Sequence, residues 1–470
     1  MNIIRRENDY LYVKLYNTLK EQIVTGFIKP GGYLLAESEL CTHYSMSRNS
    51  VRKALEQLHK EGLVVKRVGL GTMVPEDLVV TKSDRKTLRI FTPFPAHFVD
   101  YGFQFILDAF QRSYPQVDVK LLSFPVSKFW ESIRLSSELG FAPDIVLASD
   151  LQLLDRSKLA SFIDLSQDEE LAGELSSIYP KVLHAFREAN ECKAAPISFT
   201  PVYLTYNPGL FTAGGVTHPA LDWTLDDFID AAQRLTLVQS GTKDGTKDGR
   251  IHRYGFSISP DLNRWPVFAL QNGFHSPDQQ LRQSSIRQAF ALIEKLCFNE
   301  RIALAYPGIV SGTNPFVYEK SAMTLTTLFE MASWKEQNIS FEPEVAPLPF
   351  GNERTSLMQA NALMISASCS DMSLARAFIR TALSSSVQQE MCEGTPFLSI
   401  KKAINESTKS KAFLQSLHID GELIDNNVFM RELFQESDRY ELQSELGLFW
   451  LGLDSAGNAA DAVEHILMKD

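Results

Sequence analysis

The chain has 470 residues, of which 44% are hydrophobic and 22% charged, so it is long enough for two or three globular domains. Its formal net charge is −11, and no apolar run reaches the length that spans a bilayer, which argues against an integral membrane protein. The N-terminal sequence has no apolar run followed by small residues, and the five cysteines never occur as CxxC, so we expect a cytoplasmic protein without a metal or disulfide framework.

The charge is unevenly distributed along the chain. Residues 1–87 hold 14 Lys/Arg against 10 Asp/Glu, whereas the other 383 residues hold 32 Lys/Arg against 47 Asp/Glu and have a net charge of −15. Because like charges repel, only the N-terminal segment favours a polyanionic partner, and the rest is expected to lie away from nucleic acid.

The N-terminal segment predicts three helices followed by a hairpin. Leucine and isoleucine recur at four-residue steps in residues 10–26, which indicates an amphipathic helix. A short helix is expected over 37–44, and a third over 48–61 with Ser47 as its N-cap. Two β-rich runs around glycines in residues 63–74 predict a hairpin. This order of elements is that of a winged helix-turn-helix.

The third helix has one apolar face and one polar, basic face. The apolar face is formed by Val51, Ala54, Leu55 and Leu58. The arginine and asparagine side chains therefore lie on the remaining faces of the helix. A solvated helix face would explain these residues taken alone, but the complete order of elements favours base reading by the first turns of this helix. Arginine suits guanine, asparagine suits adenine, and hydroxyl groups can donate to phosphates. The candidate DNA-binding residues are Ser47, Arg48, Asn49, Ser50, Arg52, Gly71 and Thr72.

Residues 46–74, MSRNSVRKALEQLHKEGLVVKRVGLGTMV, resemble the GntR family of bacterial transcription regulators. The resemblance covers about residues 10–74 and follows the family pattern V-S-R-x-T-V-R-x-A-L-x-x-L-x-x-E-G-L…G-x-G-T-x-V. It implies that Arg48 and Arg52 contact bases or phosphates and that Gly71 lies at the wing tip. The partners implied are double-stranded operator DNA and a second copy of the chain, because palindromic half-sites need a two-fold protein.

Some positions depart from the family pattern. The family's L-P-S-E-R-E-L-A reads LLAESELC over residues 34–41, so Ser38 replaces an arginine that often contacts DNA. Leu70 stands between the wing glycines, where a polar or basic residue is usual. Fewer phosphate contacts are therefore expected, with a shallower dependence of DNA affinity on salt.

The next part predicts a linker and then an α/β domain. Residues 75–87 begin with proline and are rich in charge, which is typical of a linker. It is short enough for the winged helix to sense motion of the large domain if the two pack together or if the dimer forms through the large domain. Strand-like runs at 88–94, 117–124 and 144–149 then alternate with helix-like runs at 103–114 and 127–140. This alternation predicts a parallel sheet. Ligands bind such sheets at the carboxyl ends of the strands, here Thr92–His97 and Ser149–Asp150.

Residues 88–470 resemble the extracellular solute-binding proteins of transporters, in particular the carbohydrate-binding group that includes maltose-binding protein. The resemblance rests on six markers in the family's order: APDIV (142–146), PVYLTYNPGLFTAGGV (201–216), FALQNG (268–273), AMTLTTLFEMASW (322–334), EVAPLPFG (344–351) and SLARAFIRTAL (373–383). Ala360-Asn361 departs from a glycine pair often seen in the family, and GTKDGTKDG (241–249) is expected to be an inserted flexible surface loop, since it matches neither a calcium loop nor a P-loop.

The resemblances imply a multidomain fold, an α+β winged helix-turn-helix followed by a two-lobed α/β periplasmic-binding-protein-like domain. The expected divisions are 1–74 for the winged helix, 75–87 for the linker and 88–470 for the effector domain. Within the last, lobe 1 is expected over about 88–200 and 362–400, and lobe 2 over about 201–361 with the C-terminal tail.

The solute-binding resemblance also implies a ligand clamped between the lobes, and sugar sites combine stacking aromatic rings with short polar side chains. For each aromatic residue alone, core packing is the alternative, and Trp130 is assigned to the core. The candidate ligand-binding residues are Thr92, Phe94, Asp150, Thr200, Tyr203, Trp265 and Phe329.

The sequence thus predicts a ligand-responsive DNA-binding transcription regulator that senses a small molecule, a sugar, and is not an enzyme. No metal, cofactor, catalytic residue or membrane partner is expected. The alternative is a GntR-type regulator with a pyridoxal-phosphate aminotransferase-like domain, which requires a Schiff-base lysine. That fold would leave the solute-binding markers unexplained, and a yellow purified protein would support this alternative.

Overall fold

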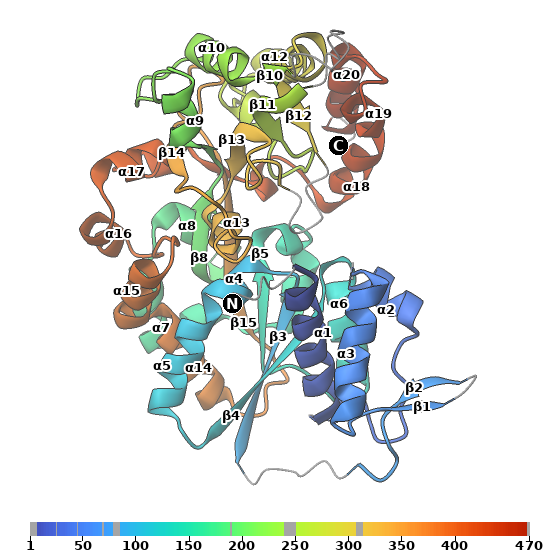
Figure 1. The fold of residues 1–470 in the computed structure, drawn as a ribbon. Coiled ribbons are helices and arrows are strands. Elements are labelled where there is room, and N and C mark those ends of the chain that lie inside the picture. The colour runs from blue at the N-terminus through green and yellow to red at the C-terminus, as the bar shows by residue number, and fades with distance from the viewer. Residues whose placement is uncertain are drawn as a thin grey trace.

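The computed structural model describes residues 7–24, 26–44, 46–67, 70–78, 85–188, 190–238, 251–306 and 314–467. The expected loop 241–249, the hairpin residues 68–69 and part of the expected linker (79–84) lie outside the described residues. In Figure 1 the N-terminal domain lies beside the lower of two α/β lobes, and the last helices cover the upper one.

The N-terminal domain is a winged helix-turn-helix, as predicted. Its elements are α1 (Glu7–Val24), α2 (Glu37–His43), α3 (Arg48–Lys60), β1 (Val65–Arg67) and β2 (Gly71–Met73). The two strands pair antiparallel with Lys66 opposite Thr72. Leu15 and Leu19 of α1 pack with Val51 and Leu55 of α3 in one buried cluster, because both helices carry an apolar stripe at helical spacing.

Lobe 1 is built around a six-stranded mixed sheet in the order β16-β15-β5-β3-β4, with β8 paired to β15. Strand β3 runs parallel to β4 and β5, while β15 is antiparallel to β5 and β8. The strands are β3 (Lys86–Phe94), β4 (Val117–Pro125), β5 (Ile145–Ser149), β8 (Ala195–Pro201), β15 (Leu357–Ile365) and β16 (Val428–Phe429). The predicted β-α-β-α-β alternation is therefore confirmed, with β3 beginning at Lys86, inside the expected linker.

Helices cover the lobe 1 sheet and share its buried core. They are α4 (His97–Tyr101), α5 (Phe103–Ser113), α6 (Phe129–Glu138), α7 (Glu169–Ser176), α8 (Pro180–His184), α14 (Met372–Leu383), α15 (Ser385–Gly394), α16 (Lys402–Thr408) and α17 (Lys411–Ser416), with a 3-10 turn η2 (Asp150–Leu153) after β5. A small hairpin of β6 (Arg187–Glu188) and β7 (Glu191–Cys192) lies outside this sheet.

Lobe 2 has its own six-stranded sheet in the order β10-β11-β13-β9-β14, with β12 paired to β11, and its own buried core. The strands are β9 (Tyr203–Tyr206), β10 (Leu237–Val238), β11 (Ile251–Ile258), β12 (Ala303–Ala305), β13 (Ser321–Thr326) and β14 (Glu344–Ala346). The helices are α9 (Pro208–Ala213), α10 (Leu225–Leu235), α11 (Pro266–Leu270), α12 (Gln279–Glu294), α18 (Glu436–Glu445), α19 (Gly447–Trp450) and α20 (Ala456–Leu467). Helix α13 (Leu328–Ser333) follows β13, but its buried side chains join the lobe 1 core.

The chain passes between the lobes three times. It crosses from β8 to β9, returns between β14 and β15, and crosses again after β16 at about residues 429–430. Strand β15 joins the lobe 1 sheet from Leu357, before the expected return at 362, because it continues its pairing with β8. Lobe 1 also keeps α16, α17 and β16, beyond the expected limit of 400.

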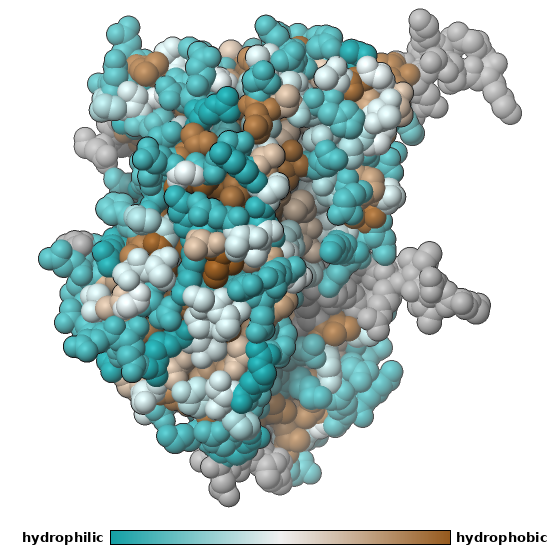
Figure 2. Space-filling model, turned by 90° about the vertical axis from the view of Figure 1, so that its left-hand side faces the viewer, coloured by the Kyte–Doolittle hydropathy of each residue, from teal (hydrophilic) through white to brown (hydrophobic). Residues whose placement is uncertain are grey.

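The solvent-exposed surface of the protein is mainly polar. The face in Figure 2 carries mainly hydrophilic side chains, with apolar residues scattered singly or in small groups. No helix in the part of the chain that the structure describes is both long and apolar enough to cross a bilayer.

Candidate functional site

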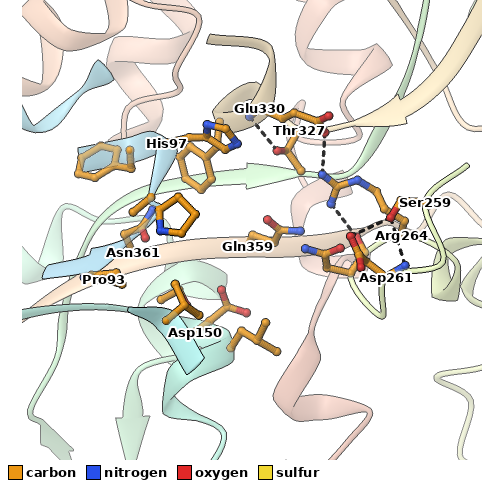
Figure 3. A pocket seen from close by; sticks show the side chains of 18 of the residues that line it. Pro93, His97, Asp150, Ser259, Asp261, Arg264, Thr327, Glu330, Gln359 and Asn361 are labelled. Carbon is orange, nitrogen blue, oxygen red and sulfur yellow. Dashed lines mark hydrogen bonds and ion pairs between the residues drawn. The ribbon is translucent and has the colours of Figure 1, made fainter. Parts of the chain in front are cut away.

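A cavity of ≈ 300 Å³ lies between the two lobes, at the carboxyl ends of β3 and β5. Lobe 1 contributes residues of the segment 93–98, the start of η2 and residues 358–361 of β15. Lobe 2 contributes residues of 259–264 and of 327–337. Figure 3 shows Gln359 of β15 between Asp150 on one side and Arg264 with Glu330 on the other. The volume lies at the lower end of the range for small-molecule sites.

The lobe 2 wall holds a buried ion pair. Arg264 Nη2 lies 2.9 Å from Glu330 Oε2, and the two side chains are only 10% and 20% exposed. Glu330 also accepts from Asn314 Nδ2 at 2.8 Å and from Thr326 Oγ1 at 3.0 Å. Burial opposes ionisation of this carboxyl, but Arg264 and Asn314 outweigh it and hold the pKa of Glu330 below its usual value. The pair therefore places balanced charges at the cavity wall.

The lobe 1 wall holds a second carboxyl, that of Asp150. Its Oδ1 accepts from the backbone N–H of Ala360 at 2.9 Å, so it ties η2 to β15. Burial raises the pKa of Asp150 to about 7, although backbone hydrogen bonds oppose that rise. This carboxyl changes charge near neutral pH.

Several polar atoms at the cavity wall are buried and have no hydrogen-bond partner among the residues that the structure describes. Three are donors, the side-chain nitrogens of Gln152, Gln359 and Trp334, and two are acceptors, the side-chain oxygens of Asn263 and Gln337. A buried polar group without a partner costs about 1–3 kcal/mol, so five together favour a polar ligand that supplies the missing partners. Since amide oxygen and nitrogen can exchange places by a flip, a ligand group that both donates and accepts fits them best.

Aromatic rings complete the wall. Phe329 lies with its ring centroid 6.1 Å from that of Phe98, and Tyr306 and Trp334 line the same cavity. Rings of this kind offer flat apolar surface to the C–H face of a ligand. Within the described ranges, no group of three or more His, Cys, Asp or Glu side chains is placed to hold a metal ion.

Asp150 and Phe329 are the two sequence-predicted ligand residues that line the cavity. Thr92 lies outside it, fully buried and hydrogen-bonded to Ser123 at 2.9 Å. Phe94 points instead into the buried cluster of the winged helix. Both residues sit at the end of β3, two positions apart, so they share one face of the sheet, while Pro93 between them lines the cavity from the other.

The other three predicted ligand residues are also internal. Thr200 accepts from the backbone N–H of Leu328 at 3.0 Å, so it joins β8 to α13. Tyr203 is fully buried and donates to Met331 Sδ at 3.4 Å. Trp265 packs in lobe 2, 5.0 Å from Phe290 between ring centroids. These residues pack behind the cavity wall and support the elements that form it.

Sequence reasoning did not single out Arg264, Glu330 or Gln359. Arg264 directly precedes the chosen Trp265, and Glu330 lies inside the quoted run TTLFEM, directly after Phe329. Their places beside the chosen residues Trp265 and Phe329 were the available signal. Trp130 packs partly buried against the lobe 1 core, as assigned, and its Nε1 donates to Gln152 O at 2.8 Å.

A second candidate site is the polar face of α3. Ser47 caps the helix by accepting from Ser50 N at 3.2 Å, and Ser50 itself is buried. Arg48 and Asn49 are exposed at the first turn. Arg52 is exposed too, and its Nε lies 2.8 Å from Glu37 Oε2 of α2. The predicted contacts Arg48, Asn49 and Arg52 therefore share the exposed N-terminal end of the helix, while the two serines shape it.

The wing lies beside this face. Gly71 has a φ of +111°, a conformation that favours glycine, at the start of β2. Thr72 is half-buried opposite Lys66, while Leu70 is 69% exposed. Lys66 and Arg67 of β1 are exposed and were not among the predicted contacts. Their place in the short strand, next to the glycine turn, was the available signal.

Comparison with protein families divides the chain in the same way. The model of bacterial regulatory proteins of the gntR family matches residues 11–74. The model of bacterial extracellular solute-binding proteins matches residues 106–414.

Curated relatives match the N-terminal part. The arabinose metabolism transcriptional repressor of Halalkalibacterium halodurans is 31% identical over 97 residues, which are 20% of this chain and 25% of the relative. The mannosyl-D-glycerate transport/metabolism system repressor MngR of Escherichia coli is 41% identical over 69 residues, 15% of this chain and 29% of the relative. The chain thus spans about a quarter to a third of the length of these relatives.

Solved structures match the larger part. The substrate-binding protein Lmo0181 of Listeria monocytogenes, in complex with cycloalternan, has a TM-score of 0.63 at 18% identity, covering 82% of this chain and 99% of that one. A solute-binding protein of Thermotoga lettingae bound with α-D-tagatose has a TM-score of 0.64 at 17% identity, covering 81% of this chain and 100% of that one. At these identities the likeness shows the two-lobed fold.

Proposed function

The chain belongs to the bacterial extracellular solute-binding protein family over residues 106–414 and carries a gntR-family winged helix at residues 11–74, and from this combination we propose a ligand-responsive, DNA-binding transcription regulator that senses a carbohydrate in its cleft.

The observation that carries the sensing half is the set of unpartnered polar atoms at the cavity wall. Sugar hydroxyls both donate and accept, so they can satisfy the nitrogens of Gln359 and Trp334 as well as the oxygen of Gln337. The Arg264–Glu330 pair is internally neutral, which favours an uncharged ligand. Phe329 and Tyr306 supply rings for stacking on a pyranose face.

The DNA-binding half rests on the exposed end of α3. Arg48 and Asn49 point outward from a helix whose other face is buried, and such a helix end fits the major groove. Lys66 and Arg67 on the wing add positive charge that suits the phosphate backbone. The corresponding segments of the arabinose and mannosyl-D-glycerate repressors support this assignment.

The remaining parts of the proposal concern assembly and setting. The regulator acts as a cytoplasmic homodimer on a palindromic operator, without a cofactor and without catalysis. The alternative fold, an aminotransferase-like domain, is not the fold observed, since the larger part has the two-lobed solute-binding architecture.

The sensing half is tested by a thermal-shift screen with the sugars named for the structural neighbours, tagatose, maltotriose and mannotriose, together with other mono- and oligosaccharides. A sugar at 100 times its dissociation constant should stabilise the fold by about 2.7 kcal/mol. Gln359→Leu should remove that shift, while Gln288→Leu, an exposed lobe 2 control, should keep it. Equal shifts in both variants would argue against this cavity.

The DNA-binding half is tested by enrichment of bound sequences from a random DNA pool. We expect a palindromic consensus, and we expect Arg48→Ala to lose it. Enrichment without a consensus would argue against a specific operator.

A further inference from the structure

The winged helix and lobe 1 each pack one phenylalanine side chain against the core of the other. Phe27, which follows α1, leaves its own domain and packs against the lobe 1 core. Its ring centroid lies 5.7 Å from that of Phe124 at the end of β4 and 6.1 Å from that of Phe141, both in edge-to-face geometry. The contact continues along α1, where Glu21 Oε2 lies 3.9 Å from Lys120 Nζ of β4. Figure 1 shows α1 beside this edge of the sheet.

Phe94 makes the corresponding contact in the opposite direction, from lobe 1 to the winged helix. This residue ends β3 of lobe 1, yet it belongs to the buried cluster of the winged helix and is 7% exposed. Its ring centroid lies 6.0 Å from that of Tyr44, in edge-to-face geometry. Both phenylalanines remove apolar surface from water at the contact between the two parts, which favours docking. A domain tethered only by a linker would have no such shared core.

Phe94 lies between the cavity and the DNA-reading helix. Pro93 and Pro95 on either side of it line the cavity, as does His97 at the start of α4. On the other side, Tyr44 is the C-cap of α2, a few residues before the N-cap Ser47 of α3. Phe94 therefore connects the segment that lines the cavity to the residues that precede α3.

We propose that the winged helix docks on lobe 1 through Phe27 and Phe94, and that within this docked unit the Phe94–Tyr44 contact carries the state of the cleft to α3. Lobe 2 is then the part that moves relative to the DNA-reading head, and the linker only tethers. This inference rests on the proposed function for its purpose, but its test needs neither DNA nor sugar, so the two can fail separately.

The docking is tested in the whole chain with a Gly/Ser segment of about 20 residues inserted after Pro75. Such a segment gives a free domain a root-mean-square reach of roughly 25 Å. A donor and an acceptor dye are attached through unnatural amino acids at two exposed positions, Glu56 on α3 and Ser113 on α5. We expect the same narrow distribution of transfer efficiency with the original and the lengthened linker, and a broad one once Phe27→Ala and Phe94→Ala are added.

The matched control is Phe341→Ala in the lengthened chain, since Phe341 is half-buried like Phe27 but lies in lobe 2. It should leave the distribution narrow. A broad distribution in the lengthened chain that keeps both phenylalanines would overturn the docking.

The route through Phe94 is tested by amide hydrogen exchange of the whole chain. We expect Phe94→Ala to speed exchange at residues 46–51 at least about tenfold, and Phe27→Ala to act instead at residues 120–125. Phe94→Leu, which keeps an apolar side chain, should restore most of the protection and shows that the effect is local. Unchanged exchange at 46–51 in Phe94→Ala would overturn the route.

Discussion

Arg52 Nε lies 2.8 Å from Glu37 Oε2, so an arginine of α3 is ion-paired with α2, the helix before it. Arg48, one turn earlier, is exposed at the start of the helix. Among the described residues, Glu37 pairs with Arg52 and not with Arg48. The two arginines therefore present different charge environments to DNA.

This difference predicts unequal effects of two substitutions. Arg48→Ala should weaken specific DNA binding by roughly 1–3 kcal/mol, as expected for a base or phosphate contact. Arg52→Ala should weaken specific DNA binding by less than Arg48→Ala, because Glu37 already balances part of the Arg52 charge. Fluorescence anisotropy at one fixed salt concentration measures both. Lys60→Ala, at the far end of α3, is the control, and a loss as large as that of Arg48→Ala would contradict the orientation of the helix.

A second prediction concerns pH. Burial raises the pKa of Asp150 to about 7 from 3.8, so the folded state keeps its proton over a range in which the unfolded state has lost it. The unfolded chain binds fewer protons there, so this carboxyl lowers stability as pH rises from about 4 to 7, with little change above. Asp150→Asn lacks the titration and should gain about 2 kcal/mol relative to the parent between pH 5.5 and 8.5.

Urea unfolding at the two pH values measures this gain. Asp108→Asn, an exposed carboxyl on α5, is the control and should show no comparable change. A constant difference between Asp150→Asn and the parent at both pH values would show that Asp150 does not titrate in this range.

A third prediction concerns the buried ion pair. Glu330→Gln leaves the Arg264 guanidinium without its carboxylate, and breaking such a pair from one side costs about 3 kcal/mol. The double change Arg264→Met with Glu330→Leu should recover much of the loss, because neither charge then remains buried alone. Thermal unfolding of the parent and of these two variants measures the difference. If the double variant is as unstable as Glu330→Gln, the loss comes from packing of α13 and not from the unpaired charge.

A fourth prediction separates the cavity wall from its support. Trp334→Phe removes a donor at the cavity but keeps an aromatic ring, so sugar affinity should fall by roughly tenfold with little loss of stability. Trp265→Phe, in the lobe 2 core, should lower the melting temperature without a specific effect on sugar affinity. Calorimetric titration with a sugar found in the thermal-shift screen tests both. The reverse pattern would exchange the roles of the two tryptophans.

The elements of the fold could be predicted from local pattern. The stripe of Val51, Ala54, Leu55 and Leu58 identified α3, and the alternation after residue 88 identified the lobe 1 sheet. Both follow from side-chain periodicity within one element, which the sequence displays directly.

The site was predicted less completely because its residues depend on contacts between distant segments. Thr92 and Phe94 end the right strand, but the face each side chain takes is decided by Ser123 of β4 and Tyr44 of the winged helix. Arg264 and Glu330 are 66 residues apart and meet only once α13 packs beside the segment 259–264. No periodicity within a single element encodes such meetings.

The most direct test of the central claim measures the DNA affinity of this chain with its cleft empty and with its cleft filled. A DNA site obtained from the random pool is titrated at constant salt, with and without a sugar that saturates the cleft by thermal shift. We predict a change in Kd of about fivefold or more, since coupling of two sites is typically worth 1–3 kcal/mol. A Kd that stays constant within twofold while the sugar occupies the cleft would contradict a ligand-responsive regulator.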